Sequence, residues 1–272
     1  MSSLGGKGYN LLILAQGGFQ VPNAFIVSEE AFREYRKDLS ISFTESHDME
    51  VTDDLLSAIQ DDIDNHLLKE ELIAEINTQL HDLVRASPIS HPLLAVRSSG
   101  VAEDLDDASF AGINETVLSV ACECGSVCDA IKTCWKSLYT RRAVDYRRKN
   151  GFPSLDTSIA VVIQVMIPSD SSGVVFTVDP HTSSRAHMAL DGVHGLGEAL
   201  VGGLVNPDHW VIRKPYGKST YSIEETSFQT QPFKLVSNYP QKGTSKQTLT
   251  ESEGKQPAFS SDEVVFESTS SH

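Results

Sequence analysis

The sequence predicts a mixed α+β fold of two packed lobes, with the boundary between them near residue 155. The first observation is the stretch from Asp53 to Val84, in which leucine and isoleucine recur at helical spacing. The second is a pair of apolar runs, Leu93–Val96 and Ile159–Ile167, that have the length and composition of strands. A helix-rich beginning followed by a strand-rich part therefore fits helices packed on sheets.

The composition limits the classes of protein that fit. The chain has 272 residues, 40% hydrophobic and 22% charged, enough to bury a substantial core. No apolar stretch reaches the roughly 18 residues of a membrane span, and the N-terminus lacks a signal-peptide pattern, so we expect a cytoplasmic protein without a membrane partner. The net charge of −15 argues against a nucleic-acid partner, which would require clustered Lys and Arg.

The chain begins with a glycine-rich segment that leads into an apolar helical pattern. Lys7 lies within Gly5–Gly8, and Gly17-Gly18 closes the pattern. A lysine among glycines at a helix N-terminus is typical of an anion site, because free amides and the helix dipole both favour phosphate. The spacing is not that of a P-loop, so a P-loop nucleotidase is disfavoured. Taken alone, the segment also fits a flexible, solvated loop.

Residues 1–155 are expected to form the first lobe. Its helical insertion is the amphipathic stretch Asp53–Val84, with one break near Asn65. A second helical pattern runs from about Val127 to Lys149 and ends in basic residues, which we interpret as a solvated helix end. Four cysteines raise the possibility of zinc, but their spacing is not a usual zinc pattern, so reduced, partly buried thiols are expected at Cys122, Cys124, Cys128 and Cys134.

The most informative run begins at the strand Leu93–Val96, with Arg97 at its end and Ser98 and Ser99 next. A guanidinium offers five donors in a rigid fork that matches phosphate oxygens, and nearby hydroxyls and loop amides can fill the remaining positions. The pattern therefore suits a triphosphate. An ion pair between Arg97 and one of the acidic residues that follow is the alternative.

A second strand is predicted by the polar and apolar alternation from Asn114 to Val120, which contains Thr116. Just before it, Gly112 would let the backbone approach a ligand closely. An ordinary turn glycine is the alternative for this position.

Residues 156–217 are expected to form a partial second lobe. Gln164 stands in the apolar run Ile159–Ile167, where an amide can read a base edge through paired donor and acceptor groups, although a solvent-facing glutamine fits too. Ser172–Thr177 predicts a core strand followed by a turn. Glycines beside Glu198 and Asp208 suit either a loop that closes on a ligand or a tight structural turn, so both acids are secondary candidates.

Residues 218–272 differ in character from the rest of the chain. Ser, Thr, Gln and Lys accumulate there and the hydrophobic spacing fades. We expect this segment to be a divergent, disordered tail.

Five segments together resemble one known family, the ATP-binding domain of phosphoenolpyruvate synthase, pyruvate phosphate dikinase and rifampicin phosphotransferase. The resemblance covers roughly residues 4–215, and its segments occur in the family's order. They are GGKGYNLLILAQGGFQVPNAFIVSEEAF, LLAVRSSGVAEDLDDASFAGINETVLSV, CWKSLYTRRAVDYRRKNGF, VVIQVMIPSDSSGVVFTVDP and GLGEALVGGLVNPDHWVI.

The resemblance implies an ATP-grasp-type nucleotide-binding domain of two lobes with ATP as ligand. Carried over by position, Lys7 and Arg97 would contact the phosphates and be the catalytic candidates. Gly112 and Thr116 would line the loop over the nucleotide, and Gln164 would lie beside the adenine. In complete family members a phosphoryl group passes from ATP to a carrier histidine and onward, leaving AMP and phosphate.

The sequence departs from the family pattern at both ends. Only three residues precede Leu4, where the family usually begins with a further strand. It lacks the PxDIEWA and QSRP segments that complete the Mg2+ site, so the metal ligands are largely missing and remain unknown. It also lacks a phosphohistidine domain, which a longer chain or a separate partner would supply. We therefore expect a domain that is incomplete at both ends, with a catalytically inactive nucleotide-binding or structural remnant as the alternative.

Overall fold

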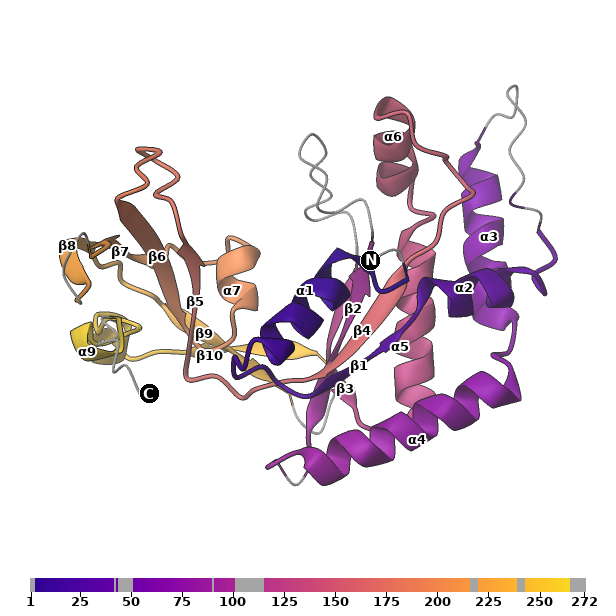
Figure 1. The fold of residues 1–272 in the computed structure, drawn as a ribbon, viewed down its shortest axis with the longest axis horizontal. Helices are drawn as coiled ribbons and strands as arrows, with labels where there is room; N and C mark the ends of the chain where they lie inside the picture. The colour runs from indigo at the N-terminus through magenta and orange to yellow at the C-terminus, as the bar shows by residue number, and fades with distance from the viewer. Residues whose placement is uncertain are drawn as a thin grey trace. The chain divides into compact units, whose positions relative to one another are not determined.

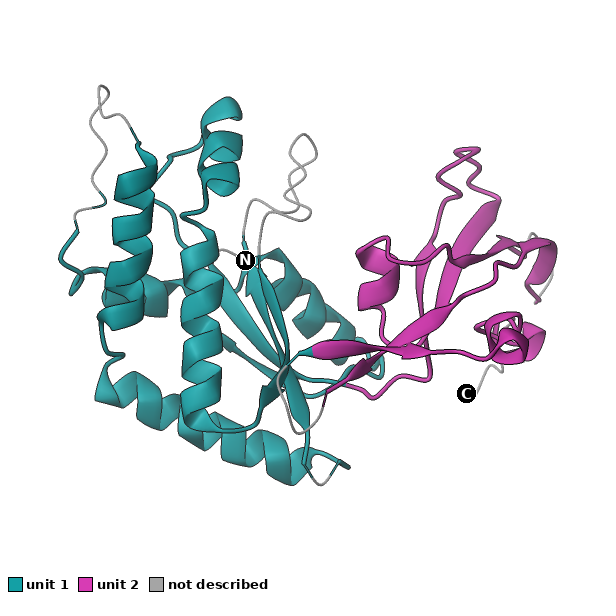
Figure 2. Ribbon diagram, turned by 180° about the vertical axis from the view of Figure 1, so that it is seen from behind, with its two compact units in different colours: residues 1–166, 239–243 teal, residues 167–238, 244–272 magenta. Residues whose placement is uncertain are grey.

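A computed structural model describes residues 3–41, 43, 51–89, 91–100, 115–215, 220–238 and 243–264. The chain divides into two compact units, residues 1–166 with 239–243 and residues 167–238 with 244–272 (Figure 2). The division lies after Met166 and not at the expected residue 155, because the strand Ala160–Val165 pairs with strands of the first unit. The mixed helix and sheet content agrees with the α+β prediction.

In its described part, the first unit is built on a four-stranded antiparallel sheet of order β1-β4-β2-β3 (Figure 1). Its strands are β1 (Ala24–Val27), β2 (Leu93–Ser99), β3 (Thr116–Ala121) and β4 (Ala160–Val165). Its helices are α1 (Gly5–Gln16), α2 (Glu29–Arg36), α3 (Asp53–Asn65), α4 (Glu70–Ala86), α5 (Cys124–Ser137) and α6 (Arg141–Lys149).

One face of this sheet carries the main hydrophobic core. Leu94 and Val96 of β2 and Ile163 of β4 are fully buried in one cluster with side chains of α2, α3, α4 and α5. Near its centre the rings of Phe32 and Trp135 stack with centroids 4.8 Å apart. Because strand side chains alternate, the residues between these core positions lie on the opposite face of the sheet.

The predicted break in the helical insertion is confirmed, since α3 ends at Asn65 and α4 begins at Glu70. The Tyr35 hydroxyl bonds to the carbonyls of Ile63 and His66 at this end of α3. The helical pattern that was expected to continue to Lys149 is instead two helices. The Thr140 side chain accepts a hydrogen bond from the Ala143 amide, an N-cap that starts α6 after α5 has ended.

The second unit contains a meander in which each strand pairs with the next along the chain (Figure 1). Its elements are β5 (Ser171–Phe176), β6 (His187–His194), α7 (Glu198–Val201), β7 (Asp208–Arg213), β8 (Ser222–Ser227), β9 (Phe233–Ser237), β10 (Thr244–Thr248), α8 (Glu251–Gly254) and α9 (Ser261–Val264). The strand predicted at Ser172–Thr177 is present as β5, but its core position is wrong. It lies at the edge of the described sheet, with Val175 54% exposed.

The described residues after 219 fold, contrary to the expected disordered tail. They form β8, the β9–β10 hairpin, α8 and α9. Phe259 of this region packs its ring against Trp210, with centroids 5.9 Å apart, and Ala258 and Val264 complete a small core with Trp210. Few hydrophobic side chains in the described part of this region are buried, namely Leu235, Ala258 and Val264, which is why the hydrophobic spacing is faint. No helix in the described ranges has the length and apolarity needed to cross a membrane.

Candidate functional site

Three of the predicted site residues share one face of the first sheet. Arg97 lies directly opposite Thr116 of β3 and directly opposite Val162 of β4. Directly opposed residues of antiparallel strands point to the same face, and Gln164, two residues beyond Val162, points there too. This is the face opposite the main hydrophobic core, and we call it the α1 face.

Helix α1 packs on this face and brings Lys7 to it (Figure 1). A Cβ on Gly8 would lie 2.9 Å from Ile26 Cδ1 and 3.6 Å from Val162 Cγ2, so the glycine allows the helix to approach β1 and β4 closely. The Lys7 ammonium donates to the carbonyl of Ser98 at 3.0 Å. Lys7 therefore reaches the strand β2 one residue beyond Arg97.

The start of α1 is joined to the end of β2 by a set of bonds that we call the α1–β2 junction. The Gly6 amide donates to the Gly100 carbonyl at 2.9 Å, and the Gly8 amide donates to Ser99 Oγ at 3.0 Å. The sequence predicted amides free to bind an anion at this helix N-terminus. For Gly6 and Gly8 that prediction is wrong, because both amides are already bonded within the protein.

The hydroxyls of Ser98 and Ser99 are also engaged in the fold. Ser98 Oγ donates to the Glu115 carbonyl at 2.9 Å, and Ser99 Oγ donates to the Leu4 carbonyl at 2.9 Å. Both serines are buried. Their observed contacts tie β2 to β3 and to α1.

Arg97 and Gln164 are half-buried. Gln164 does not simply face solvent, since its Nε2 donates to the Pro22 carbonyl at 3.2 Å. Arg97 forms no ion pair with any residue in the part of the chain that the structure describes. Gly112, and the acidic residues of the ion-pair alternative for Arg97, lie outside the described residues.

Glu198 and Asp208 belong to the second unit, whereas the other described candidates belong to the first. Glu198 is exposed and accepts a hydrogen bond from Thr244 Oγ1 at 2.7 Å. Asp208 is fully buried, and its two oxygens accept from the amides of Gln229 and Ala258, each at 2.8 Å. Asp208 is the first residue of β7, and these contacts join it to segments distant in the sequence, which is a structural role but not that of a tight turn.

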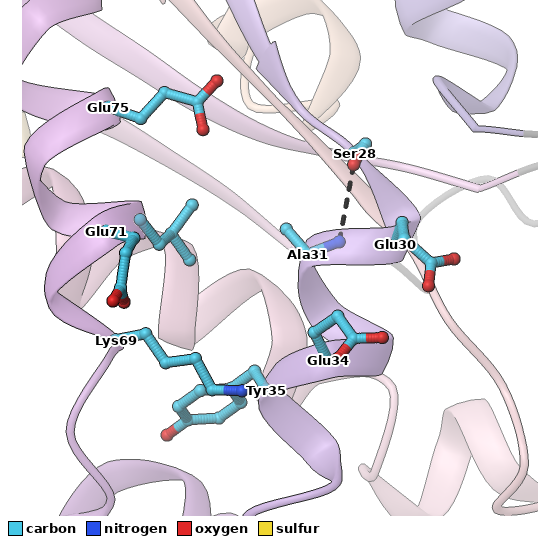
Figure 3. Close-up of a pocket in the computed structure, with 9 residues that line it drawn as sticks. Ser28, Glu30, Ala31, Glu34, Tyr35, Lys69, Glu71 and Glu75 are labelled. Atoms are coloured by element: carbon cyan, nitrogen blue, oxygen red, sulfur yellow. Dashed lines mark hydrogen bonds between the residues drawn. The ribbon is translucent and has the colours of Figure 1, made fainter.

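Sequence reasoning missed a cavity of about 320 Å3 between α2 and α4 (Figure 3). Ala31, Leu72 and Tyr35 contribute to its lining, together with glutamates of both helices, among them Glu34 and Glu71. Its walls come from helices far apart in the sequence, so no local motif could have indicated it. None of the predicted site residues lines it.

The family of the pyruvate phosphate dikinase AMP/ATP-binding domain matches residues 1–266. The chain belongs to this family. Two phosphoenolpyruvate synthases are similar to the domain: one named as probable from Archaeoglobus fulgidus, 38% identical over 86% of this chain, and one from Pyrococcus furiosus, 32% identical over 86% of it. The rifampicin phosphotransferase of Bacillus cereus is 36% identical over 78% of this chain.

The chain spans about a third of the length of these synthases, 31% and 33% respectively, and 25% of the rifampicin enzyme. Residues 1–266, which the family matches, contain every candidate site residue.

Phosphoryl transfer commonly uses Mg2+ held by one or two carboxylates. Across the described ranges of this dikinase-family domain, no group of three or more His, Cys, Asp or Glu side chains could hold a metal ion. No described residue is therefore assigned to the metal.

The cysteines of the dikinase-family domain are free thiols that pack against the core. Burial raises the pKa of Cys134 to about 12, and its sulfur lies 3.6 Å from the Val96 carbonyl. Burial also raises the pKa of Cys128 to about 12, with its sulfur 3.9 Å from that of Cys124. A thiolate is the metal-binding form, so these raised values do not favour metal binding at Cys128 or Cys134.

Proposed function

We propose that this domain binds ATP at the α1 face of its first sheet. The observation that carries the proposal is that Lys7, Arg97, Thr116 and Gln164, which come from four different elements, converge on that side of the sheet. A site with two cations at one end and an amide further along a strand has the polarity of a nucleotide, charged at the phosphates and neutral at the base.

Each side chain has a role that suits its chemistry. Lys7 and Arg97 bind the β- and γ-phosphates and are the catalytic candidates. A guanidinium donates two parallel hydrogen bonds to phosphate oxygens, and an ammonium acts on them as a point charge. The Thr116 hydroxyl, which shares a cross-strand position with Arg97, and Gly112 assist at the phosphates. Gln164 places the adenine through its amide.

The proposal extends to an ATP-grasp architecture and to the reaction of a phosphoenolpyruvate synthase-like phosphotransferase. The antiparallel α+β units and the names of the relatives support it. In that reaction ATP yields AMP and phosphate through a phosphohistidine on another domain, either in a longer chain or in a separate partner. Magnesium would be needed for turnover, whereas binding rests on the residues of this chain.

A second candidate function is nucleotide binding without turnover, as a catalytically inactive remnant. The observation that favours it is that, among the described residues, no group of three or more His, Cys, Asp or Glu side chains could hold a metal ion. The two candidates differ in one product, because only the enzyme would release AMP and phosphate when supplied with ATP, Mg2+ and a phosphohistidine domain.

The test is ATP binding to the 272-residue protein, measured by isothermal titration and by thermal shift with and without Mg2+. Arg97→Ala should weaken binding by about 1.5–3 kcal/mol, the scale of a hydrogen bond to a charged group, or about 10- to 150-fold in Kd. Arg142→Ala, at an exposed position on α6, is the matched control. An unchanged Kd for Arg97→Ala removes Arg97 from the site, and a folded wild-type protein that does not bind ATP refutes the proposal.

A further inference from the structure

One buried hydroxyl holds the start of α1 at two points. Ser99 Oγ donates to the Leu4 carbonyl at 2.9 Å and accepts from the Gly8 amide at 3.0 Å. Ser99 has no exposed surface, so water cannot replace either bond. The two anchored groups lie on either side of Lys7 in the sequence.

A glycine completes the same α1–β2 junction. Gly5 has φ +66°, a conformation that favours glycine, and a Cβ there would overlap the backbone and hydroxyl of Ser99. The Gly6 amide bonds to the Gly100 carbonyl beyond the end of β2. Close backbone contact and three hydrogen bonds therefore fix the first turn of α1 against this strand.

The consequence concerns the two cations of the proposed phosphate site. Lys7 is carried by this first turn, and its ammonium bonds to Ser98, the residue between Arg97 and Ser99. Successive helical residues are rotated by about 100°, so a small turn of α1 about its axis would swing the Lys7 side chain away from β2. Arg97 would stay in place, since β2 pairs with strands on both sides.

We propose that Ser99 is a positioning residue for the terminal phosphates of the nucleotide. It does not contact the ligand; its hydroxyl sets the start of α1, and through it Lys7, relative to Arg97. This inference rests on the proposed ATP-binding function. A lysine held in place beforehand loses less conformational freedom on binding than one on a loose helix turn, which favours affinity.

The test compares two nucleotides on Ser99→Ala, which removes both bonds with almost no change in side-chain volume. We expect the Kd for ATP to rise about tenfold and the Kd for AMP to stay within about twofold, because AMP lacks the phosphates that Lys7 binds. General loosening of the domain would weaken both nucleotides. Equal weakening of ATP and AMP, or no weakening of ATP, overturns the inference.

A double-mutant cycle tests whether the effect passes through Lys7. In a Lys7→Met background, Ser99→Ala should change the ATP Kd by less than about twofold. An undiminished tenfold effect in that background overturns the inference. Wild-type protein that binds neither nucleotide would instead refute the proposed function, so the two failures are distinguishable.

Ser137→Ala is the matched control for losing a buried serine. Ser137 is 5% exposed, and its hydroxyl donates within α5 to the Cys134 carbonyl at 2.6 Å. We expect Ser137→Ala to lower the melting temperature about as much as Ser99→Ala does and to leave the affinity for both nucleotides unchanged. Should Ser99→Ala fail to fold, Ser99→Cys keeps a weaker donor and acceptor at the same position, and a rise of two- to fivefold in the ATP Kd alone is expected.

Discussion

Asp208→Asn tests whether Asp208 is a structural residue or part of a binding site. In the wild-type protein, Oδ1 accepts from the Gln229 amide and Oδ2 from the Ala258 amide, both at 2.8 Å, and Gln231 Nε2 lies 3.4 Å from Oδ2. Every neighbouring group is a donor. Asparagine offers one oxygen and one NH2 group, so in either orientation its NH2 faces a backbone donor with which it cannot bond.

The expected loss of stability follows from these contacts. One charge-assisted bond disappears, which costs about 1.5–3 kcal/mol, and the remaining bond becomes neutral and weaker by up to about 1 kcal/mol. The sum is about 1.5–4 kcal/mol for the second unit. With a urea slope of about 2 kcal/mol/M, the unfolding midpoint should fall by about 0.8–2 M.

The assay uses the chain's two tryptophans, because Trp135 lies in the first unit and Trp210 in the second. In a Trp135→Phe background, fluorescence reports Trp210 alone. Trp135 Nε1 has no hydrogen-bond partner among the described residues, so this background removes no bond there. Release of Ala258 would also move Phe259, whose ring packs on Trp210, so the signal follows the contact under test.

Asp170→Asn at an exposed position of the same unit is the control and should leave the midpoint unchanged. A midpoint shift below about 0.3 M for Asp208→Asn would refute the structural assignment. A shift of the expected size, with ATP affinity unchanged at urea concentrations where both proteins are folded, would remove Asp208 from the candidate site residues.

Two further predictions concern ionisable groups in the first unit. Burial raises the pKa of Glu29 above its ordinary 4.5, against the opposing effects of Ser158 and Arg33, so the folded carboxyl holds its proton to a higher pH than the unfolded one. The difference in unfolding free energy, wild type minus Glu29→Gln, measured by urea titration at acid pH, should therefore fall as the pH rises from about 4.5 through the raised pKa and then level off. A difference that does not change with pH contradicts this. Burial also raises the pKa of Cys134 to about 12, so a pulse of iodoacetamide at pH 8 should leave this cysteine unlabelled until urea unfolds the unit. Labelling is read by peptide mass spectrometry, and labelling of Cys134 in the native protein contradicts its buried position.

Much of the fold was predictable where the signal is local. The apolar run before Arg97 gave the position of β2, and the spacing of leucine and isoleucine gave α3, α4 and the break between them. The end of α5 was missed because the basic helical pattern continues beyond it, while the Thr140 cap that separates α5 from α6 depends on one side chain. The edge position of β5 was missed because an apolar strand sequence does not say what covers it.

The candidate site was predictable in its residue types but not in its geometry. The spacing of residues along the sequence does not show that Arg97 pairs with Thr116, because the register between β2 and β3 is set by contacts between distant parts of the chain. The same limit explains Gly6 and Gly8, whose amides looked available until β2 supplied their acceptors. Asp208 was ambiguous for the same reason, since its donors follow it by 21 and 50 residues.

The contacts of the first unit connect the two cations of the proposed phosphate site. Lys7 and Arg97 are far apart in the sequence, yet both are connected to β2. Arg97 is a residue of this strand, and Lys7 is held to it by the Ser98 carbonyl and the α1–β2 junction. That connection lies within one compact unit and uses no residue of the other. Affinity for the terminal phosphates should therefore depend on the first unit, in whose described residues no group of three or more His, Cys, Asp or Glu side chains could hold a metal ion. Substitutions at the junction should accordingly change the ATP Kd without any phosphoryl acceptor present, and a domain without turnover can still discriminate ATP from AMP.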